Sequence, residues 1–340
     1  MATKKQELIA FKILDKNGTD FYGNKFEVGK KYTTKDLNES SETDTSPIEL
    51  LKGVSMMRTR QVRCILSGRL KLIYRGVYKA TELEVVEEVD PLYLAALEIE
   101  RAMSDDKMPK RVGYTSGDFK VDKICRSSRP FEKMSSGFDG ALISSFSQYS
   151  EIRVSGNEAK VSSSGYDSFL YIGGERNVIN STGDECIIVV WGRGHYISVG
   201  GENSTVCAEG GDIAVSSSDD FVKIITLGIN NRISTTGDGV EICSSGYGTI
   251  ISSTGEKSII KSTGKNCMIS ACGDSIVSAG LGSWITLTRT KRDNNGNTVP
   301  VDVVSWCVDG ECIFPDVFYK LGDDDFEPVK ISGSIIENIY

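Results

Sequence analysis

The sequence has a single histidine, no long apolar run and fewer basic than acidic residues. No segment approaches the roughly 18 consecutive apolar residues of a membrane span, and the apolar stretch at the N-terminus is too short for a signal peptide. We therefore expect a cytoplasmic protein without a membrane partner. The formal net charge of −8 favours solubility and argues against nucleic acid as the main partner.

The nine cysteines are an odd number in a chain without a secretion signal, so reduced thiols are expected. Cys307 and Cys312 flank a Val-Asp-Gly-Glu turn, a spacing that allows a disulfide across a hairpin or half of a zinc site. Zinc is disfavoured because the chain offers neither a second histidine nor a second cysteine pair.

A glycine recurs at every ninth residue from Gly156 to Gly282, and only Asp219 interrupts the series. An aliphatic residue stands four positions before most of these marks, and the column ends with Ser278 and then Leu287. A fixed period with one apolar and one glycine column is typical of a stacked solenoid. The glycines are residues 156, 165, 174, 183, 192, 201, 210, 228, 237, 246, 255, 264, 273 and 282.

Within each repeat, five residues of alternating character predict a short strand, and the glycine predicts a turn with a positive φ. Positions six, four and two before the glycine then point inward. The outward residue three before the glycine alternates over 18 residues between apolar, as at Tyr171 and Val189, and polar, as at Ser162 and Asn180. Two nonapeptides per coil therefore form a parallel β-solenoid with one apolar and one polar face.

The apolar face is the predicted protein-interaction site, because a contiguous outward apolar patch marks a covered or partner-binding surface. Three interpretations stay open: flanking segments of the chain cover the face, a second copy binds it in a homo-oligomer such as a dimer, or another protein binds it. The residues assigned to the site are Phe169, Tyr171, Ile187, Val189, Trp191, Ile225 and Leu227.

The segments before the solenoid suggest two further parts. Residues 1–89 form a small β-rich domain, and Asp90 and Pro91 predict the cap and first residue of a helix over 91–103. Residues 90–136 contain this helix and a linker that is basic over 107–133, where pairing with the acidic solenoid is expected. Strands are expected at 7–14, 25–28, 61–66, 70–74 and 81–86, with a polar loop at 38–47.

The solenoid is expected to span residues 137–287, followed by a β-hairpin cap over 288–340. Asn295-Gly296 and Asp309-Gly310 are hairpin signals in this cap. Such hairpins would close the terminal edge of the solenoid and prevent it from pairing with other chains.

A resemblance rests on the repeats, on the closing segment and on one N-terminal phrase. The matching residues are the two repeats at 251–266, Gly-Ser-Trp-Ile-Thr-Leu at 282–287, the segments 308–313 and 318–329, and Phe-Glu-Val-Gly-Lys-Lys-Tyr-Thr at 26–33. The chain resembles uncharacterised repeat proteins of gut bacteria and their phages with STG-type nonapeptides. The resemblance implies a β-solenoid of phage or prophage origin and implies no activity.

Motifs for catalysis and for cofactor or metal binding find little support. His195 occupies an inward position of the repeat, which favours a structural imidazole. Acidic residues follow many glycines, but the Gly-Gly-x-Gly-x-Asp frame of calcium-binding repeats is absent. No phosphate-binding or dinucleotide fingerprint occurs. We therefore predict no catalytic residue, no cofactor and no metal site.

These features favour a non-enzymatic binding or scaffold protein, which would bind and block a host factor in the host cytoplasm if a phage encodes it. One alternative is a structural virion component, either a decoration or a fibre protein. Another is an enzyme with its site in residues 1–89. Imitation of a nucleic acid outline is disfavoured because Arg193, Lys257 and Lys265 interrupt the acidic columns.

Overall fold

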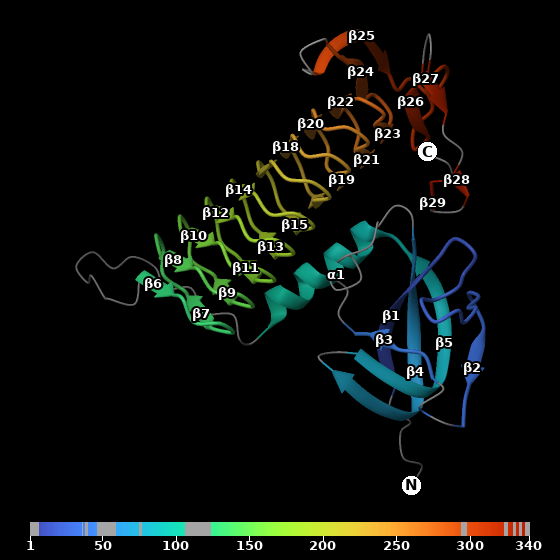
Figure 1. Ribbon diagram of the computed structural model, residues 1–340, viewed down its shortest axis with the longest axis vertical. Coiled ribbons are helices and arrows are strands. Elements are labelled where there is room, and N and C mark those ends of the chain that lie inside the picture. The colour runs from blue at the N-terminus through green and yellow to red at the C-terminus, as the bar shows by residue number, and fades with distance from the viewer. Residues whose placement is uncertain are drawn as a thin grey trace. The chain divides into compact units, whose positions relative to one another are not determined.

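The computed structural model describes residues 7–35, 37, 40–45, 59–74, 77–105, 124–293, 298–322, 326–328, 331–332 and 335–336. The chain divides into two compact units, residues 1–98 with 330–340 and residues 99–329. Strands dominate both units (Figure 1), which confirms an all-β dominated fold with an N-terminal β domain and a solenoid. In the part of the chain that is described, no helix is long and apolar enough to cross a membrane.

The N-terminal domain is one sheet with the strand order β2-β5-β3-β1-β4. Its buried core includes Leu14, Val62 and Val85. The two strands expected at 61–66 and 70–74 are one long strand with a register shift between Ser67 and Leu70. The strands are β1 (Leu8–Leu14), β2 (Lys31–Thr33), β3 (Thr43–Asp44), β4 (Arg60–Tyr74) and β5 (Val77–Val89).

Two predictions for this domain were wrong. Residues 25–28 form no strand, because the amide of Phe26 donates to Gly18 O in a loop and only Lys25 makes an isolated bridge, to Thr19. The segment expected to be a polar loop contributes β3, whose Thr43 and Asp44 pair with Tyr78 and Val77. Both errors concern short segments whose pairing partners are distant in the sequence, so that local composition does not reveal them.

The connecting helix α1 (Pro91–Ser104) follows the predicted cap. Asp90 Oδ1 accepts a hydrogen bond from the backbone amide of Tyr93 at 2.8 Å, and Pro91 occupies the first helical position, where no amide hydrogen is needed. Most of the basic linker falls within residues 106–123, outside the described residues.

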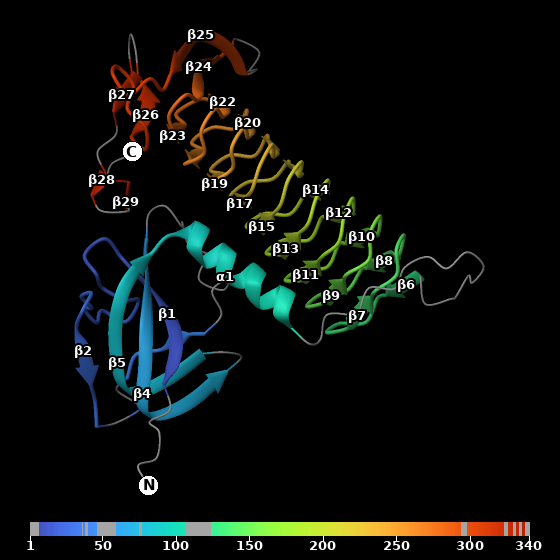
Figure 2. The same cartoon turned by 180° about the vertical axis from the view of Figure 1, so that it is seen from behind.

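The solenoid consists of two parallel sheets whose strands alternate along the chain (Figures 1 and 2). Sheet I contains β6 (Ile124–Ser127), β8 (Leu142–Ser145), β10 (Lys160–Ser163), β12 (Val178–Ser181), β14 (Tyr196–Val199), β16 (Ala214–Ser217), β18 (Arg232–Thr235), β20 (Ile250–Ser253), β22 (Met268–Cys272), β24 (Trp284–Arg292) and β25 (Thr298–Cys307). Sheet II contains β7 (Lys133–Ser136), β9 (Glu151–Val154), β11 (Phe169–Ile172), β13 (Ile187–Trp191), β15 (Thr205–Glu209), β17 (Lys223–Leu227), β19 (Glu241–Ser244), β21 (Ile259–Ser262), β23 (Ile276–Ala279), β26 (Phe318–Leu321) and β27 (Phe326–Pro328).

The predicted 18-residue coil is confirmed by the strand register, in which Val161 pairs with Ile179 and Leu170 with Ile188. The aliphatic column is buried throughout, as expected for the inward position. The end of the column differs from the prediction. Ile260 pairs with Val277 and Ile269 with Ile285, because each of the last two repeats is one residue shorter. Val277 and Ile285 therefore continue the column in place of Ser278 and Leu287.

The glycine column has a different cause from the one expected, because only six of its fourteen glycines have a positive φ. In the others, successive turns stack too closely for a side chain. A Cβ on Gly201 would lie 2.0 Å from Gly183 O, and one on Gly255 would lie 1.9 Å from Gly237 O. The glycine period therefore reports the contact between neighbouring coils more than the shape of each turn.

In most turns a left-handed residue stands two positions after the glycine mark, as at Asp167, Glu185 and Asn203. Its amide donates to a carbonyl of the next coil, for example from Glu185 to Glu202 O at 2.9 Å. A ladder of backbone hydrogen bonds therefore joins the turns as well as the strands, and this makes the turns a regular and rigid edge.

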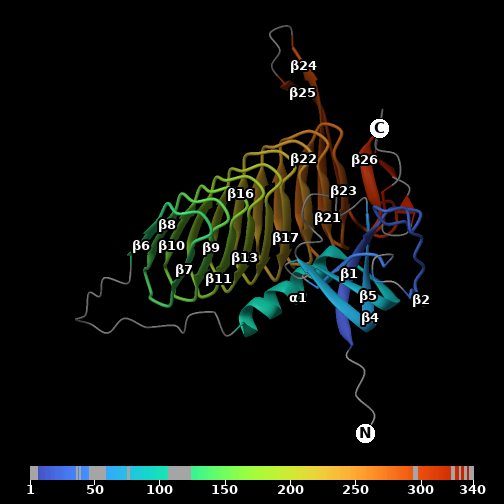
Figure 3. The same cartoon turned by 60° about the horizontal axis from the view of Figure 1, so that its bottom comes forward.

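Two features mark the ends of the stack. The first coil begins at Ile124, since β6 and β7 pair in parallel with β8 and β9, ahead of the boundary expected at residue 137. At the other end β24 and β25 form the hairpin predicted around Asn295-Gly296, and Figure 3 shows it projecting beyond the coils. Residues 294–297 themselves lie outside the described part.

The second hairpin prediction was wrong. Asp309 Oδ1 accepts hydrogen bonds from the amides of Glu311, Cys312 and Ile313, which turns the chain from sheet I to sheet II. There β26 pairs antiparallel with β23 and extends into β27. Cys307 and Cys312 are free thiols and form no disulfide. The remaining strands, β28 (Ile331–Ser332) and β29 (Ile335–Ile336), pair with each other.

Candidate functional site

The outward face of sheet II carries the residues that the sequence assigned to protein interaction. Parallel register brings Phe169 beside Ile187 and Tyr171 beside Val189, and Ile225 lies two coils further on. All five side chains are buried, with exposed fractions between 0% and 7%. These side chains are therefore largely withdrawn from solvent. The proposed role of these residues in binding another protein stays a prediction.

The other two residues of the predicted site lie at the margin of that face. Trp191 and Leu227 are half-buried at the ends of β13 and β17, and Glu209 stands between them in the register. A Cβ on Gly173 would lie 2.6 Å from the Trp191 ring, so the indole packs directly on the preceding coil. Trp191 and Leu227 thus do not form one contiguous patch with each other.

A polar pair interrupts the covered face of sheet II. Lys223 and Glu241 are adjacent in the register and are 6% and 5% exposed. Burial lowers the pKa of Lys223 to about 8, although the charge of Glu241 opposes the change. Because a buried charge is costly unless it is compensated, this pair restricts which surfaces can cover the face.

Within the second unit, an ion pair holds the segment after α1 against sheet II. Arg153 Nη1 lies 2.9 Å from Asp105 Oδ2, and its Nε lies 2.6 Å from Glu151 Oε1. The guanidinium also lies over the Tyr171 ring, 4.7 Å from the centroid. Arg153 therefore joins the end of the helix to the edge of the covered face.

The turns that lead from sheet I to sheet II form an acidic edge, which sequence reasoning did not separate from the rest. The acidic columns seemed interrupted because Arg193, Lys257 and Lys265 were counted together, but Arg193 and Lys265 belong to turns from sheet II to sheet I. In the turn segments 164–168, 182–186, 200–204, 218–222, 236–240, 254–258 and 273–275, Lys257 is the one basic residue. None of the carboxylates there is buried: Asp167, Asp184, Glu185, Glu202, Asp219, Asp220, Asp238, Glu256 and Asp274.

Part of this acidic edge is held by its own backbone. The Asp220 carboxylate accepts the amide of Asp238 at 2.7 Å, and Asp238 in turn accepts the amide of Glu256 at 2.7 Å. Asp184 accepts the amide of Glu202 in the same way, at 3.0 Å. The carboxylates consequently follow one another at the spacing of the coils, about 4.8 Å.

His195 has the structural role predicted for it. The side chain is 0% exposed, and its Nδ1 accepts the amide of Asn177 at 3.2 Å. Nε2 lies 3.3 Å from Trp191 O and donates to it in the tautomer that this pairing requires. Asn177 makes the equivalent bonds one coil earlier, to the amide of Ala159 and to Gly173 O. Burial lowers the pKa of His195, which keeps the ring neutral.

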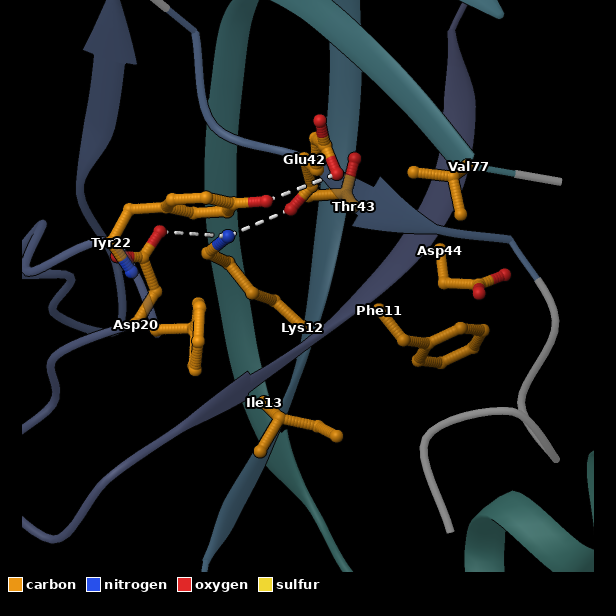
Figure 4. A pocket seen from close by; sticks show the side chains of 10 residues that line it. Phe11, Lys12, Ile13, Asp20, Tyr22, Glu42, Thr43, Asp44 and Val77 are labelled. Carbon is orange, nitrogen blue, oxygen red and sulfur yellow. Dashed lines mark hydrogen bonds and ion pairs between the residues drawn. The ribbon is translucent and has the colours of Figure 1, made fainter. Parts of the chain in front are cut away.

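A pocket of about 290 Å³ lies in the N-terminal domain beside β1 and β3 (Figure 4). Its floor holds Lys12, whose Nζ lies 3.0 Å from Asp20 Oδ2 and donates to Glu42 O at 2.7 Å and to Ser41 Oγ. Tyr22 at the rim donates its hydroxyl to Glu42 Oε2 at 3.3 Å. The three hydrogens of the ammonium group thus have three acceptors, and Lys12 fastens two loops to β1.

Burial opposes ionisation of Asp20, but hydrogen bonds from Ser41 and Asn24 and the charge of Lys12 outweigh it and lower its pKa to about 2. Burial lowers the pKa of the Lys12 amine, and the charge of Asp20 opposes this change. Lys12 and Asp20 therefore form a buried ion pair, which we call the Lys12–Asp20 clamp. Across the described residues, no group of three or more His, Cys, Asp or Glu side chains is placed to hold a metal ion.

Sequence reasoning also missed the outward residues five positions before the glycine marks in sheet I. They are exposed and mostly apolar, and testing this position at 18-residue intervals would have found all of the large ones except Trp284, which follows two shortened repeats. The large members are Ile124, Leu142, Val178, Tyr196, Ile250, Met268 and Trp284, with exposed fractions from 42% to 63%.

Comparison of the chain with models of protein families, with curated proteins and with solved structures finds no match.

Proposed function

We propose that the chain is a non-enzymatic binding scaffold that docks a protein partner with a basic surface along its acidic edge. The observation that carries the proposal is the gathering of nine carboxylates and one lysine in the seven turns of residues 164–275 that lie on a single edge of the stack. The carboxylates are repeated at about 4.8 Å on a rigid backbone, so they lose little conformational entropy when a partner pairs with them. Charge of one sign along an edge also steers an oppositely charged partner toward it.

The resemblance to phage repeat proteins supports a host factor as the class of partner, met in the host cytoplasm and blocked by binding. Nucleic-acid-binding proteins of the host have basic surfaces of the required kind. The position of Arg193 and Lys265 away from the acidic edge favours this partner class, because over residues 164–275 the edge is then interrupted by Lys257 alone. The first turn of the same edge, 128–132, adds Arg129 beside Glu132.

The proposal is tested by reversing charge on one edge and, with the same change of net charge, on the other. The edge variant carries Glu202→Lys, Glu256→Lys and Asp274→Lys, which leave the backbone-capping carboxylates in place. The control carries Glu158→Lys, Glu175→Lys and Asp212→Lys in turns from sheet II to sheet I, all exposed. A decalysine peptide serves as the basic probe in calorimetric titrations at two salt concentrations.

We expect the edge variant to lose at least about tenfold in affinity and the control to lose less than about threefold, with weaker binding at higher salt. Equal losses in both variants would reduce the effect to net charge and would contradict a docking edge. Cross-linking in a host extract, compared between the same two variants, then identifies a protein whose capture depends on the edge.

A further inference from the structure

Among the described residues, the outward face of sheet I carries exposed or half-buried side chains from β6 to β24, unlike the buried face of sheet II. Parallel sheets normally have both faces buried, so a bare face with large apolar side chains calls for a partner. The strand register places ten residues in one line across ten consecutive strands. This apolar row consists of Ile124, Leu142, Lys160, Val178, Tyr196, Ala214, Arg232, Ile250, Met268 and Trp284.

A second row, of small residues except for Arg126 at its first strand and Asn180, runs beside the apolar row. It consists of Arg126, Ser144, Ser162, Asn180, Ser198, Ser216, Ser234, Ser252, Ser270 and Thr286. Small side chains leave this half of the face flat, so another flat face can approach closely. The two rows contain three cations and no carboxylate.

The centre of the apolar row contains a bulge next to a hollow. Tyr196 is 63% exposed, and its neighbour in the register is Ala214, the smallest residue of the row. A groove of about 480 Å³ lies here, and its lining includes Tyr196, Ala214 and Arg232 of the apolar row and Ser198, Ser216 and Ser234 beside it. Of ten strands in the row, five lie on each side of the boundary between Tyr196 and Ala214.

We propose that the face of sheet I binds the same face of a second copy, around a two-fold axis that runs parallel to the strands and passes between Tyr196 and Ala214. With this axis, the apolar row of one copy faces the apolar row of the other, and the order of the strands along the two rows is opposite. Tyr196 of each copy then enters the hollow above Ala214 of the other, beside Arg232. Ring and guanidinium are arranged for a cation–π contact. Such reciprocal contacts are what a two-fold interface requires.

The charges of the row agree with the reversed order. Lys160 of one copy faces Ile250 of the other, and Arg232 faces Val178, so no cation faces a cation. A two-fold axis along the apolar row would instead place each residue of the row opposite its own copy, with Lys160 against Lys160 and Arg232 against Arg232. Like charges directly opposite each other are destabilising.

The size of the face is sufficient for a dimer. The nine intervals of about 4.8 Å between ten strands and a width of about four residues at 3.3 Å give roughly 570 Å² per copy. The total of about 1,100 Å² passes the ~1,000 Å² expected of a biological interface and lies near the lower limit for stable ones. The dimer is therefore reversible, and monomer and dimer exchange with concentration.

The first test is the molar mass of the full chain by sedimentation and light scattering over a range of concentrations. We expect the mass to rise from 37.1 kDa toward twice that value. Tyr196→Asp removes the central contact and should weaken association by at least about tenfold. Tyr247→Asp is the matched control, since Tyr247 is 55% exposed on a turn outside the face.

A second pair of variants tests the reversed order. Leu142 and Ile250 are both 42% exposed, and each has one cation beside it in its own row, Lys160 and Arg232 respectively. In the proposed dimer Leu142 faces Met268, whereas Ile250 faces Lys160 of the other copy. Leu142→Glu should therefore weaken the dimer at least about tenfold, and Ile250→Glu should preserve or strengthen it.

Circular dichroism of each variant verifies that it is folded. A protomer mass at every concentration, or equal effects of Tyr196→Asp and Tyr247→Asp, overturns the interface. A trimer overturns the two-fold axis and favours a fibre component. Equal weakening by both glutamate variants overturns the reversed order. The face of sheet I is separate from the acidic edge, so the decalysine titration and these measurements fail independently.

Discussion

At the scale of single residues, His195 shows how one side chain substitutes for another. Its two ring nitrogens make the bonds that the amide groups of Asn177 and Asn231 make in other coils. The inward position before the strand of sheet I thus needs one acceptor for an amide of the preceding coil and one donor for a nearby carbonyl. Either asparagine or neutral histidine meets that need.

His195→Asn should therefore change the free energy of unfolding by less than about 1 kcal/mol, whereas His195→Leu should cost about 1–3 kcal/mol, because it leaves a buried amide and a buried carbonyl unpaired. Chemical denaturation of both variants at pH 7 measures this. Equal costs would show that the volume of the side chain matters and its hydrogen bonds do not.

The same residue makes stability depend on pH. The pKa of His195 is lowered in the folded protein, so the unfolded chain binds a proton more readily. Its contribution is therefore lost as the pH falls below about 6.5, the ordinary pKa of histidine. Between pH 7 and pH 5 the wild type should lose more stability than His195→Asn, and parallel curves would contradict this.

Asp20 gives a second prediction at this scale. Its pKa of about 2 is lower than in the unfolded chain, so its contribution is complete above about pH 4 and is lost as the pH falls toward 2. Asp20→Asn should remove this dependence and cost about 3–5 kcal/mol, because Lys12 stays buried without its counter-charge. Acid titration and denaturation of the full chain measure both effects.

Asp15→Asn is the matched control. Asp15 Oδ1 accepts the amides of Asn17 and Thr19 just as Asp20 Oδ1 accepts those of Tyr22 and Asn24. Asp15 is exposed, and no buried lysine is paired with it in the described contacts. A cost within about 0.5 kcal/mol is expected there. A similar cost at both positions would attribute the effect to the turns alone.

At the scale of elements, the turn is where strand stacking limits the choice of residue. Gly200 and Gly201 are neighbours with opposite surroundings. A Cβ on Gly201 would lie 2.0 Å from Gly183 O, while the nearest atom to a Cβ on Gly200 is 3.6 Å away. Neither residue has a positive φ, so conformational strain does not distinguish them.

Gly201→Ala should accordingly destabilise the solenoid by about 1–3 kcal/mol, since the backbone of the adjacent coil must shift. Gly200→Ala should be neutral or stabilise by about 0.4–1 kcal/mol, because alanine restricts the unfolded chain. Denaturation midpoints of the two variants decide the matter. If alanine is tolerated equally at both sites, stacking distance is not the reason for the glycine period.

At the scale of the whole molecule, the two sheets of the solenoid have different surroundings although their repeats are alike. The face of sheet II is buried and contains the pair of Lys223 and Glu241, while the face of sheet I is bare. Arg153 connects the covered face to Asp105 after the helix. A substitution of Arg153 removes this ion pair without altering the buried core.

Arg153→Leu should cost about 1–3 kcal/mol and speed hydrogen exchange in β9 and β11, because a partly buried ion pair and the contact with Tyr171 are both lost. Arg176→Leu is the control, since Arg176 pairs with Glu158 on the exposed surface, where such a pair contributes about 0–1 kcal/mol. Equal hydrogen exchange in the two variants would mean that Arg153 does not hold the segment at Asp105 against sheet II.

The sequence by itself determined the solenoid. Its 18-residue coil, its inward aliphatic column and the capped helix at Asp90 all depend on residues close in the chain, and each repeat is stabilised by copies of itself. In a periodic sequence, the contacts of each repeat can therefore be inferred from the neighbouring repeats. The role of His195 was predictable for the same reason, because its column shows which groups that position contacts.

Only the tertiary structure decided what lies around the stack. The pairing of β3 with β5, the buried Lys12–Asp20 clamp and the Arg153–Asp105 ion pair on sheet II join residues far apart in the sequence, and no local pattern encodes them. The division of the turns into an acidic and a mixed edge also needed the structure, since the nine-residue period superimposes the two. Which surfaces remain free for partners follows from these long-range contacts.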